Sequence, residues 1–238
     1  MKKNPLLILL ICLCVLVLAG TAVLIWYFAS YRPKQERTEQ YRKIFNDYYN
    51  AKVESFATQN AENAGRQIDV VFLGDSLTDG YDLARYYPQY VTLNRGISGD
   101  TTVGLENRLD VSVYQVKPKV AVMLIGVNNL ATMLDNYEAI LQGFKANIPD
   151  TKIVLLSLTS MADYWAYNNQ LAAYTNAYIK RYAQLYGYTF VDLYTPLFDV
   201  TTGEMKREYT VDGGHFTHEG YTVLTDAITP VLASLLGY

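Results

Sequence analysis

The protein has 238 residues, with 20 Lys and Arg against 23 Asp and Glu and a formal net charge of −3 at pH 7. A chain of this length can form one large domain or two small ones. The slight negative charge and the absence of a basic stripe in the sequence argue against a nucleic-acid-binding protein. Half of the residues are hydrophobic and only 18% are charged, but this average combines two unlike parts of the chain.

The first part is an apolar segment, residues 5–29, that contains no charged residue. At about 1.5 Å rise per residue, a helix of this length can span a hydrocarbon core of roughly 30 Å. Lys2 and Lys3 precede the segment, and aromatic residues, Trp26 among them, lie near its far end, as is common at membrane interfaces. We therefore predict a transmembrane signal-anchor over residues 1–30, with membrane contact through residues 5–29.

A cleaved signal peptide is the alternative interpretation of this segment. Residues 19–22 are small, as a signal peptidase prefers, although the apolar run continues beyond them. Lys2 and Lys3 favour a cytoplasmic N-terminus. The only cysteines, Cys12 and Cys14, lie in this segment, so the rest of the chain can fold in an oxidising compartment. Both interpretations place the remaining residues outside the cytoplasm.

The next residues, 31–65, are polar and charged, with apolar residues at helical spacing, which predicts a helical segment leading into a domain. Short apolar runs then alternate with longer amphipathic ones. Strands are predicted at 68–73, 90–93, 120–125, 153–158 and 189–193. Helices are predicted at 101–115, 134–147, 166–186 and 217–236. Because the strands are apolar throughout, they favour a parallel sheet covered on both faces, and hence one α/β domain of three α/β/α layers over residues 66–238.

Clusters of polar residues follow the predicted strands, at the end where the active sites of parallel sheets lie. The clusters are Gly74-Asp75-Ser76, residues 94–100, residues 126–129, and Asp212-Gly213-Gly214-His215. Taken singly, each cluster has a structural explanation as a helix cap or a turn. Taken together, they supply every group that acyl transfer to a serine requires.

A serine hydroxyl becomes a nucleophile when an imidazole takes its proton, and a carboxylate usually holds that imidazole in the right tautomer. We predict Ser76 as the nucleophile and His215 as the base. Asp212 is predicted to orient His215, because an interval of three residues can bring its carboxylate back to the ring. The other histidine, His218, lies one turn further along and is the less suitable base.

The negative oxygen that forms during attack needs preplaced hydrogen-bond donors. The backbone N–H groups of Ser76 and Gly99 and the side-chain amide of Asn128 are predicted to supply them. Asp75 and Asn129 are predicted supporting residues, with Asp75 bracing the Ser76 loop. A metal site is not favoured, because two histidines without cysteines or clustered carboxylates make a poor ligand set. This chemistry needs no cofactor.

The four blocks, in this order, resemble the SGNH (GDSL) hydrolase family, which is named for a catalytic Ser, Gly, Asn and His. The similarity covers residues 68–222, and residues 94–102 resemble the branch related to platelet-activating-factor acetylhydrolase catalytic subunits. The resemblance implies a flavodoxin-like α/β/α fold with a five-stranded parallel sheet. Many members have an aspartate where Asn129 stands, while Asn128 keeps the amide donor. A nucleophile in Gly-Asp-Ser, rather than Gly-x-Ser-x-Gly, excludes the α/β-hydrolase fold.

The resemblance implies a serine esterase that cleaves carboxylic esters through an acyl-enzyme, and the apolar N-terminal segment predicts that it is extracytoplasmic. The ester stays open between an acetylated polysaccharide, a lipid-type ester such as a lysophospholipid, and another small molecule. Six aromatic residues in loops or helix starts could stack on sugars, but tyrosine is also common on ordinary surfaces. They are Tyr81, Tyr86, Tyr87, Tyr164, Trp165 and Tyr167. The alternative function is a non-catalytic binding or scaffolding module at the cell surface.

Overall fold

The structure, a computed structural model, describes residues 4–237. Its internal contacts divide the chain into two compact units, Met1–Asn50 and Ala51–Tyr238. Lys2 and Lys3 lie outside the described residues, so the predicted cytoplasmic N-terminus stays a prediction. The predicted division at residues 30 and 65 likewise stays a prediction.

The N-terminal unit is helical from Pro5 onward. Helix α1 (Pro5–Trp26) passes through a π-helical turn (Tyr27–Tyr31) into α2 (Arg32–Glu62). Asn4 caps α1 by accepting a hydrogen bond from the backbone N–H of Leu6 at 3.2 Å. The helical run contains an 18-residue window with a mean hydropathy of 3.1, none of which is buried. By length and composition it is a candidate membrane span, and a signal sequence would have the same properties.

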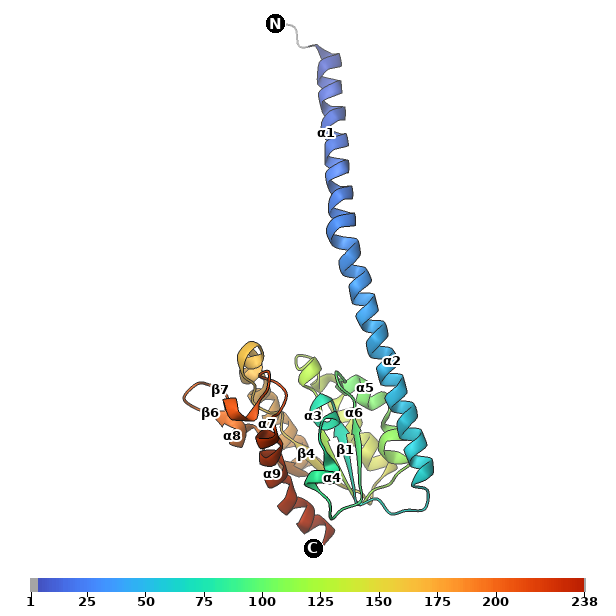
Figure 1. Ribbon diagram of the computed structural model, residues 1–238, viewed down its shortest axis with the longest axis vertical. Coiled ribbons are helices and arrows are strands. Elements are labelled where there is room, and N and C mark those ends of the chain that lie inside the picture. The colour runs from blue at the N-terminus through green and yellow to red at the C-terminus, as the bar shows by residue number, and fades with distance from the viewer. Residues whose placement is uncertain (1–3, 238) are drawn as a thin grey trace. The chain divides into compact units, whose positions relative to one another are not determined.

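The second unit is built on a five-stranded parallel sheet (Figure 1). The strands are β1 (Val70–Gly74), β2 (Thr92–Gly96), β3 (Val120–Leu124), β4 (Lys152–Leu156) and β5 (Thr189–Val191). Their spatial order is β2-β1-β3-β4-β5, so the chain reverses its direction of winding between β1 and β3. Ligand sites in such sheets lie at this switch point, beyond the carboxyl ends of the strands. The predicted three-layer α/β/α fold with five parallel strands is confirmed.

Helices cover both faces of the sheet, and Figure 1 shows α6 and α9 on opposite sides of β1. One face packs against α5 (Thr102–Asn107), α6 (Leu134–Asn147) and α7 (Asn169–Tyr186). The other packs against α3 (Ser76–Asp79), α4 (Leu83–Tyr86), α8 (Tyr194–Leu197) and α9 (His218–Leu236). The remaining short elements are π-helix Asp110–Tyr114, 3-10 helices Val127–Asn129, Asp163–Asn168 and Arg207–Tyr209, and the hairpin β6 (Phe198–Asp199) with β7 (Glu204–Met205).

Burial on both faces explains why the strands are apolar throughout. Successive residues of β1 point to opposite sides: Val71 and Leu73 enter one core cluster, while Val70 and Phe72 enter the other. A strand exposed on one side would alternate apolar and polar residues instead. The predicted helix over 101–115 occurs as α5 followed by a π-helical turn. Helices of a single turn, such as α3, are too short to give a periodic signal.

Candidate active site

The Ser76 loop leaves β1 by a tight turn. A Cβ atom on Gly74 would meet Thr78 Oγ1 at 2.1 Å and the carbonyl oxygen of Leu124 at 2.3 Å, so only glycine fits there. Asp75 then caps α3, because its Oδ1 accepts a hydrogen bond from the backbone N–H of Leu77 at 3.1 Å. Ser76 is therefore the first residue of α3, at the carboxyl end of β1 and next to the switch point.

The structure brings Ser76, His215 and Asp212 into one hydrogen-bonded chain. His215 Nε2 lies 2.9 Å from Ser76 Oγ, and His215 Nδ1 lies 2.7 Å from Asp212 Oδ2. The other carboxylate oxygen of Asp212 accepts from the backbone N–H groups of Gly214 at 3.0 Å and His215 at 2.8 Å. Partial burial raises the pKa of Asp212, but these hydrogen bonds outweigh it and lower the pKa to about 2. Asp212 is thus an ionised acceptor for the imidazole at any ordinary pH.

The second histidine, His218, has different partners. It is the first residue of α9, and its ring contacts the Tyr86 hydroxyl through Nδ1 and Arg85 Nη2 through Nε2, the latter at 2.9 Å. These bonds hold His218 in a cluster with α4. The two histidine rings therefore have different hydrogen-bond partners, and the Ser76 hydroxyl is hydrogen-bonded to His215.

The three predicted oxyanion donors occupy neighbouring loops. Ser76, Asn128 and His215 line one cavity of about 430 Å³; among the described residues, Gly99 does not line it. Gly99 lies on the exposed loop after β2, with a φ of +80° that favours glycine. Asn128 Nδ2 donates to the carbonyl oxygen of Asp100 at 2.8 Å, which ties the two loops together. An amide nitrogen carries two hydrogens, so this bond engages one of them and leaves the second for a ligand.

Asn129 uses both ends of its side-chain amide. Its Oδ1 accepts from the backbone N–H of Thr102 at 3.2 Å, and its Nδ2 donates to the Thr102 hydroxyl at 2.9 Å. These bonds link the loop after β3 to the start of α5. A departure from the aspartate of many SGNH members is therefore structurally accommodated here, because the amide serves as both donor and acceptor.

Asp75 lies beneath the serine and is 1% exposed. Burial raises its pKa to about 7; the N–H of Leu77 opposes this rise, and the nearby carboxylate of Asp100 adds to it. Its bond to Leu77 fits the predicted bracing of the serine loop.

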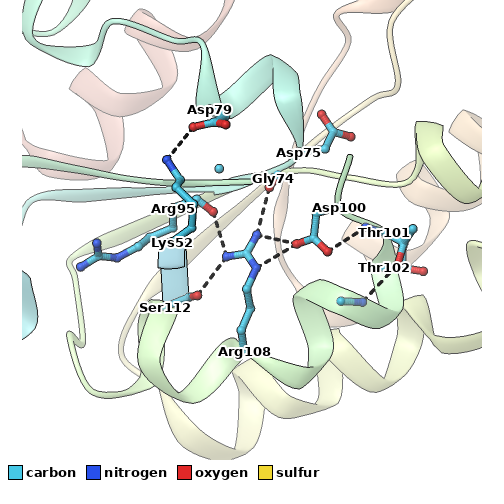
Figure 2. A network of polar contacts seen from close by, with 12 residues as sticks. Lys52, Gly74, Asp75, Asp79, Arg95, Asp100, Thr101, Thr102, Arg108 and Ser112 are labelled. Carbon is cyan, nitrogen blue, oxygen red and sulfur yellow. Dashed lines mark hydrogen bonds and ion pairs between the residues drawn. The ribbon is translucent and has the colours of Figure 1, made fainter. Parts of the chain in front are cut away.

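Sequence reasoning missed Arg108, which is 2% exposed and connects the loops behind the site (Figure 2). Its guanidinium donates to Asp100 Oδ2 at 2.8 Å, to the Gly74 carbonyl at 3.0 Å and to the Arg95 carbonyl at 2.9 Å. The sequence gives only a weak indication of this buried role, namely one arginine between Leu105 and Leu109 in a predicted amphipathic helix. In isolation, an arginine in an amphipathic helix is usually a surface residue.

The rest of the cavity is largely apolar. Its other lining residues are the apolar Leu77, Val127, Leu130, Ala131, Met161, Trp165 and Leu171, together with Asn129, Thr132, Thr159, Tyr167, Asn168 and Gly214. Of the aromatic residues singled out in the sequence, Trp165 and Tyr167 reach this cavity and are 40% and 70% exposed. Tyr81 and Tyr87 lie instead in the core, where their hydroxyls bond to each other at 2.9 Å.

Comparison with known proteins identifies the family to which the sequence is similar. The model of the GDSL-like Lipase/Acylhydrolase family matches residues 72–223. A GDSL-like lipase from Bacteroides thetaiotaomicron is 26% identical, with a TM-score of 0.68 over 76% of this chain and 97% of its own. A Streptococcus pneumoniae protein, provisionally assigned as a platelet activating factor, is 25% identical, with a TM-score of 0.69 over 83% of this chain and 99% of its own. No curated protein sequence matches the chain. The family resemblance drawn from the four sequence blocks is confirmed.

Proposed function

The chain belongs to the GDSL-like lipase/acylhydrolase family of ester-type hydrolases, and on this basis we propose that it is a serine esterase whose nucleophile is Ser76. The observation that carries the proposal is the continuous chain of hydrogen bonds from Ser76 Oγ through the His215 ring to Asp212. A nucleophile, a base and an orienting carboxylate in that order are the parts that general-base activation of serine requires.

The proposed reaction proceeds through an acyl-enzyme. His215 Nε2 takes the proton of Ser76 as Oγ attacks the ester carbonyl carbon, while Asp212 holds Nδ1–H and stabilises the imidazolium that forms. The carbonyl oxygen becomes negative and accepts hydrogen bonds from the N–H of Ser76, the N–H of Gly99 and the amide of Asn128. His215 then gives its proton to the leaving alcohol oxygen. Water, deprotonated by His215, then attacks the acyl carbon; the bond from that carbon to Ser76 Oγ breaks, the acid leaves, and His215 returns the proton to Oγ.

The experiment that tests this proposal is labelling with a fluorophosphonate probe, which phosphonylates an activated serine. Wild-type protein is expected to be labelled, and Ser76→Ala is expected to be inert. Ser234→Ala is the matched control, because it removes another exposed serine, near the C-terminal end of α9, and should keep the label. Folded wild-type protein that stays unlabelled would contradict the proposal and favour a non-catalytic module.

The proposed substrates are acyl or acetyl esters. The cavity is compatible both with a lipid-type ester and with an acetylated carbohydrate. Its apolar lining suits a short acyl chain, while the exposed rings of Trp165 and Tyr167 at its edge suit a sugar. Nitrophenyl esters of two to twelve carbons, compared with acetylated oligosaccharides, separate the alternatives. A lipid-type enzyme should gain in kcat/KM with chain length, whereas a carbohydrate deacetylase should prefer acetyl and lose activity in Trp165→Ala.

We also propose that the apolar helix anchors the enzyme in a membrane with the catalytic unit outside the cytoplasm, or is cleaved to release it there. The support is the length and apolar composition of α1. Protease added to intact cells should digest the catalytic unit in both cases. The N-terminal peptide of the mature protein then distinguishes an anchor from a cleaved signal.

A further inference from the structure

The end of α2, from Ala51 to Glu62, bonds to α3 and β2, although it lies outside the residues that match the family. Phe56 is buried there, with 1% of its surface exposed. Around it, polar side chains of α2 bond to Asp79 in α3 and to Arg95 in β2, two elements that lead into the candidate site. Two routes of contact lead from this helix end toward the site, and Figure 2 shows the first contact of one of them, between Lys52 and Asp79.

The first route passes through Asp79, the last residue of the helix that begins at Ser76. Lys52 Nζ donates to Asp79 Oδ1 at 2.6 Å, and the two side chains are 28% and 12% exposed. The other oxygen, Oδ2, accepts from the backbone N–H of Ser98 at 3.1 Å and from its hydroxyl at 2.7 Å. Ser98 directly precedes Gly99. One carboxylate therefore joins α2, the nucleophile helix and the loop of a proposed oxyanion donor.

The second route is buried. Arg95 donates to Gln59 Oε1 and Asn60 Oδ1, both at 2.6 Å, and its guanidinium lies over the Phe56 ring at 4.7 Å. Arg108, which holds the carbonyl of Gly74, lies over the same ring at 5.7 Å. Burial and the neighbouring Arg108 lower the pKa of Arg95 to about 10. The acceptors and the ring supplied by α2 thus help to keep two cations side by side behind the site.

We propose that the end of α2 is a positioning element of the active site, in which Lys52 holds Asp79 so that the Ser76 helix and the Gly99 loop keep their spacing. The inference rests on the proposed esterase activity. Its physical basis is that attack and oxyanion stabilisation both require fixed geometry, since a nucleophile and its donors act on the two ends of one carbonyl bond. Lys52 touches no reacting atom and acts through Asp79.

The test compares full-length variants in detergent, with a nitrophenyl acetate substrate. Lys52→Met should lower kcat by about 3- to 10-fold, well short of the roughly 100-fold that a misplacement of an ångström can cost. KM should stay within a factor of about two, because the cavity lining is untouched. Lys52→Arg should restore most of the lost kcat, since it returns a cation to Asp79.

Lys119→Met is the matched control. Lys119 also pairs with an aspartate, Asp69, at 2.8 Å, but at the end of β1 remote from the site. A purely structural role predicts equal kcat losses in Lys52→Met and Lys119→Met at equal loss of stability in urea, and that result would overturn the proposal.

A double-mutant cycle with Asp79→Asn tests the proposed route. If Lys52 acts through Asp79, the double variant should have nearly the same kcat as the worse single variant, whereas independent effects would multiply and contradict the route. Wild-type protein without any turnover would overturn the esterase proposal itself. Active wild type with an unimpaired Lys52→Met would overturn the positioning role alone.

Discussion

The two ends of β1 carry aspartates in opposite electrostatic surroundings. Asp69 precedes the strand, and although burial raises its pKa, a hydrogen bond and ion pair with Lys119 and the N–H of Val91 outweigh that effect and lower it. Asp75 follows the strand, and burial raises its pKa to about 7. The first aspartate stabilises the fold as an anion. The second is an unfavourable buried anion, and it lies directly beneath the proposed nucleophile.

The difference shows where this fold places electrostatic strain. At the carboxyl end of the sheet, the buried charged residues Asp75, Asp100, Arg95 and Arg108 lie around Gly74 (Figure 2). At the amino end, Asp69 forms a partly exposed ion pair with Lys119. Buried charges cost free energy of desolvation but fix geometry when they are hydrogen-bonded, as Arg108 is. The polar carboxyl end suits preorganised chemistry, and the amino end suits stability.

The largest expected effect at the carboxyl end concerns the two histidines. His215→Ala should lower kcat by a factor on the order of 10⁴ or more, because the serine then has no base. His218→Ala should retain a measurable share of activity, since its ring bonds to Tyr86 and Arg85 rather than to Ser76. Steady-state turnover of nitrophenyl acetate measures both. Equal losses in the two folded variants would show that the base has been misassigned.

The sequence predicted the five strands and the three side chains, Ser76, His215 and Asp212, that hydrogen bonds connect. Strand β2, predicted at 90–93, runs over Thr92–Gly96, so the start of the second polar block lies within the strand rather than after it. These predictions depend on local signals: continuous apolar runs, and polar residues directly after them.

Arg108 could not be recognised, because its partners Gly74 and Asp100 come together only when β1 and β2 pair. The same holds for Lys52, whose partner Asp79 lies 27 residues away. The positions of Arg108 and Lys52 therefore depend on contacts between residues far apart in the sequence, which residue type alone does not predict.

An intermediate effect is expected from Asp75→Asn, which removes the buried anion but keeps an acceptor for the Leu77 N–H. The pKa of this carboxyl is raised from 3.8 to about 7 in the folded protein. It therefore does not lower the free energy of unfolding below pH 3.8, and lowers it increasingly as the pH rises from 3.8 to about 7. The substitution should therefore raise the free energy of unfolding at pH 8, by on the order of 2 kcal/mol, relative to its effect at pH 3.5. Urea titrations at the two pH values measure this. An effect of the substitution that is no more favourable at pH 8 than at pH 3.5 would contradict it.

The smallest effect is expected at the other end of β1. Asp69 has a lowered pKa, so it contributes stability above the unfolded value near 3.8, and this contribution is lost as the pH falls through the folded value. Asp69→Asn should therefore destabilise the protein at pH 7, by less than about 1 kcal/mol because Lys119 is half exposed, and have little effect at pH 2. The sign is opposite to that of Asp75→Asn at neutral pH. Urea midpoints for both variants measure these changes in stability. Turnover measured alongside them tests function: Asp69→Asn should leave kcat unchanged, because the Asp69 side chain bonds to Val91 and Lys119, at the end of β1 opposite to Ser76.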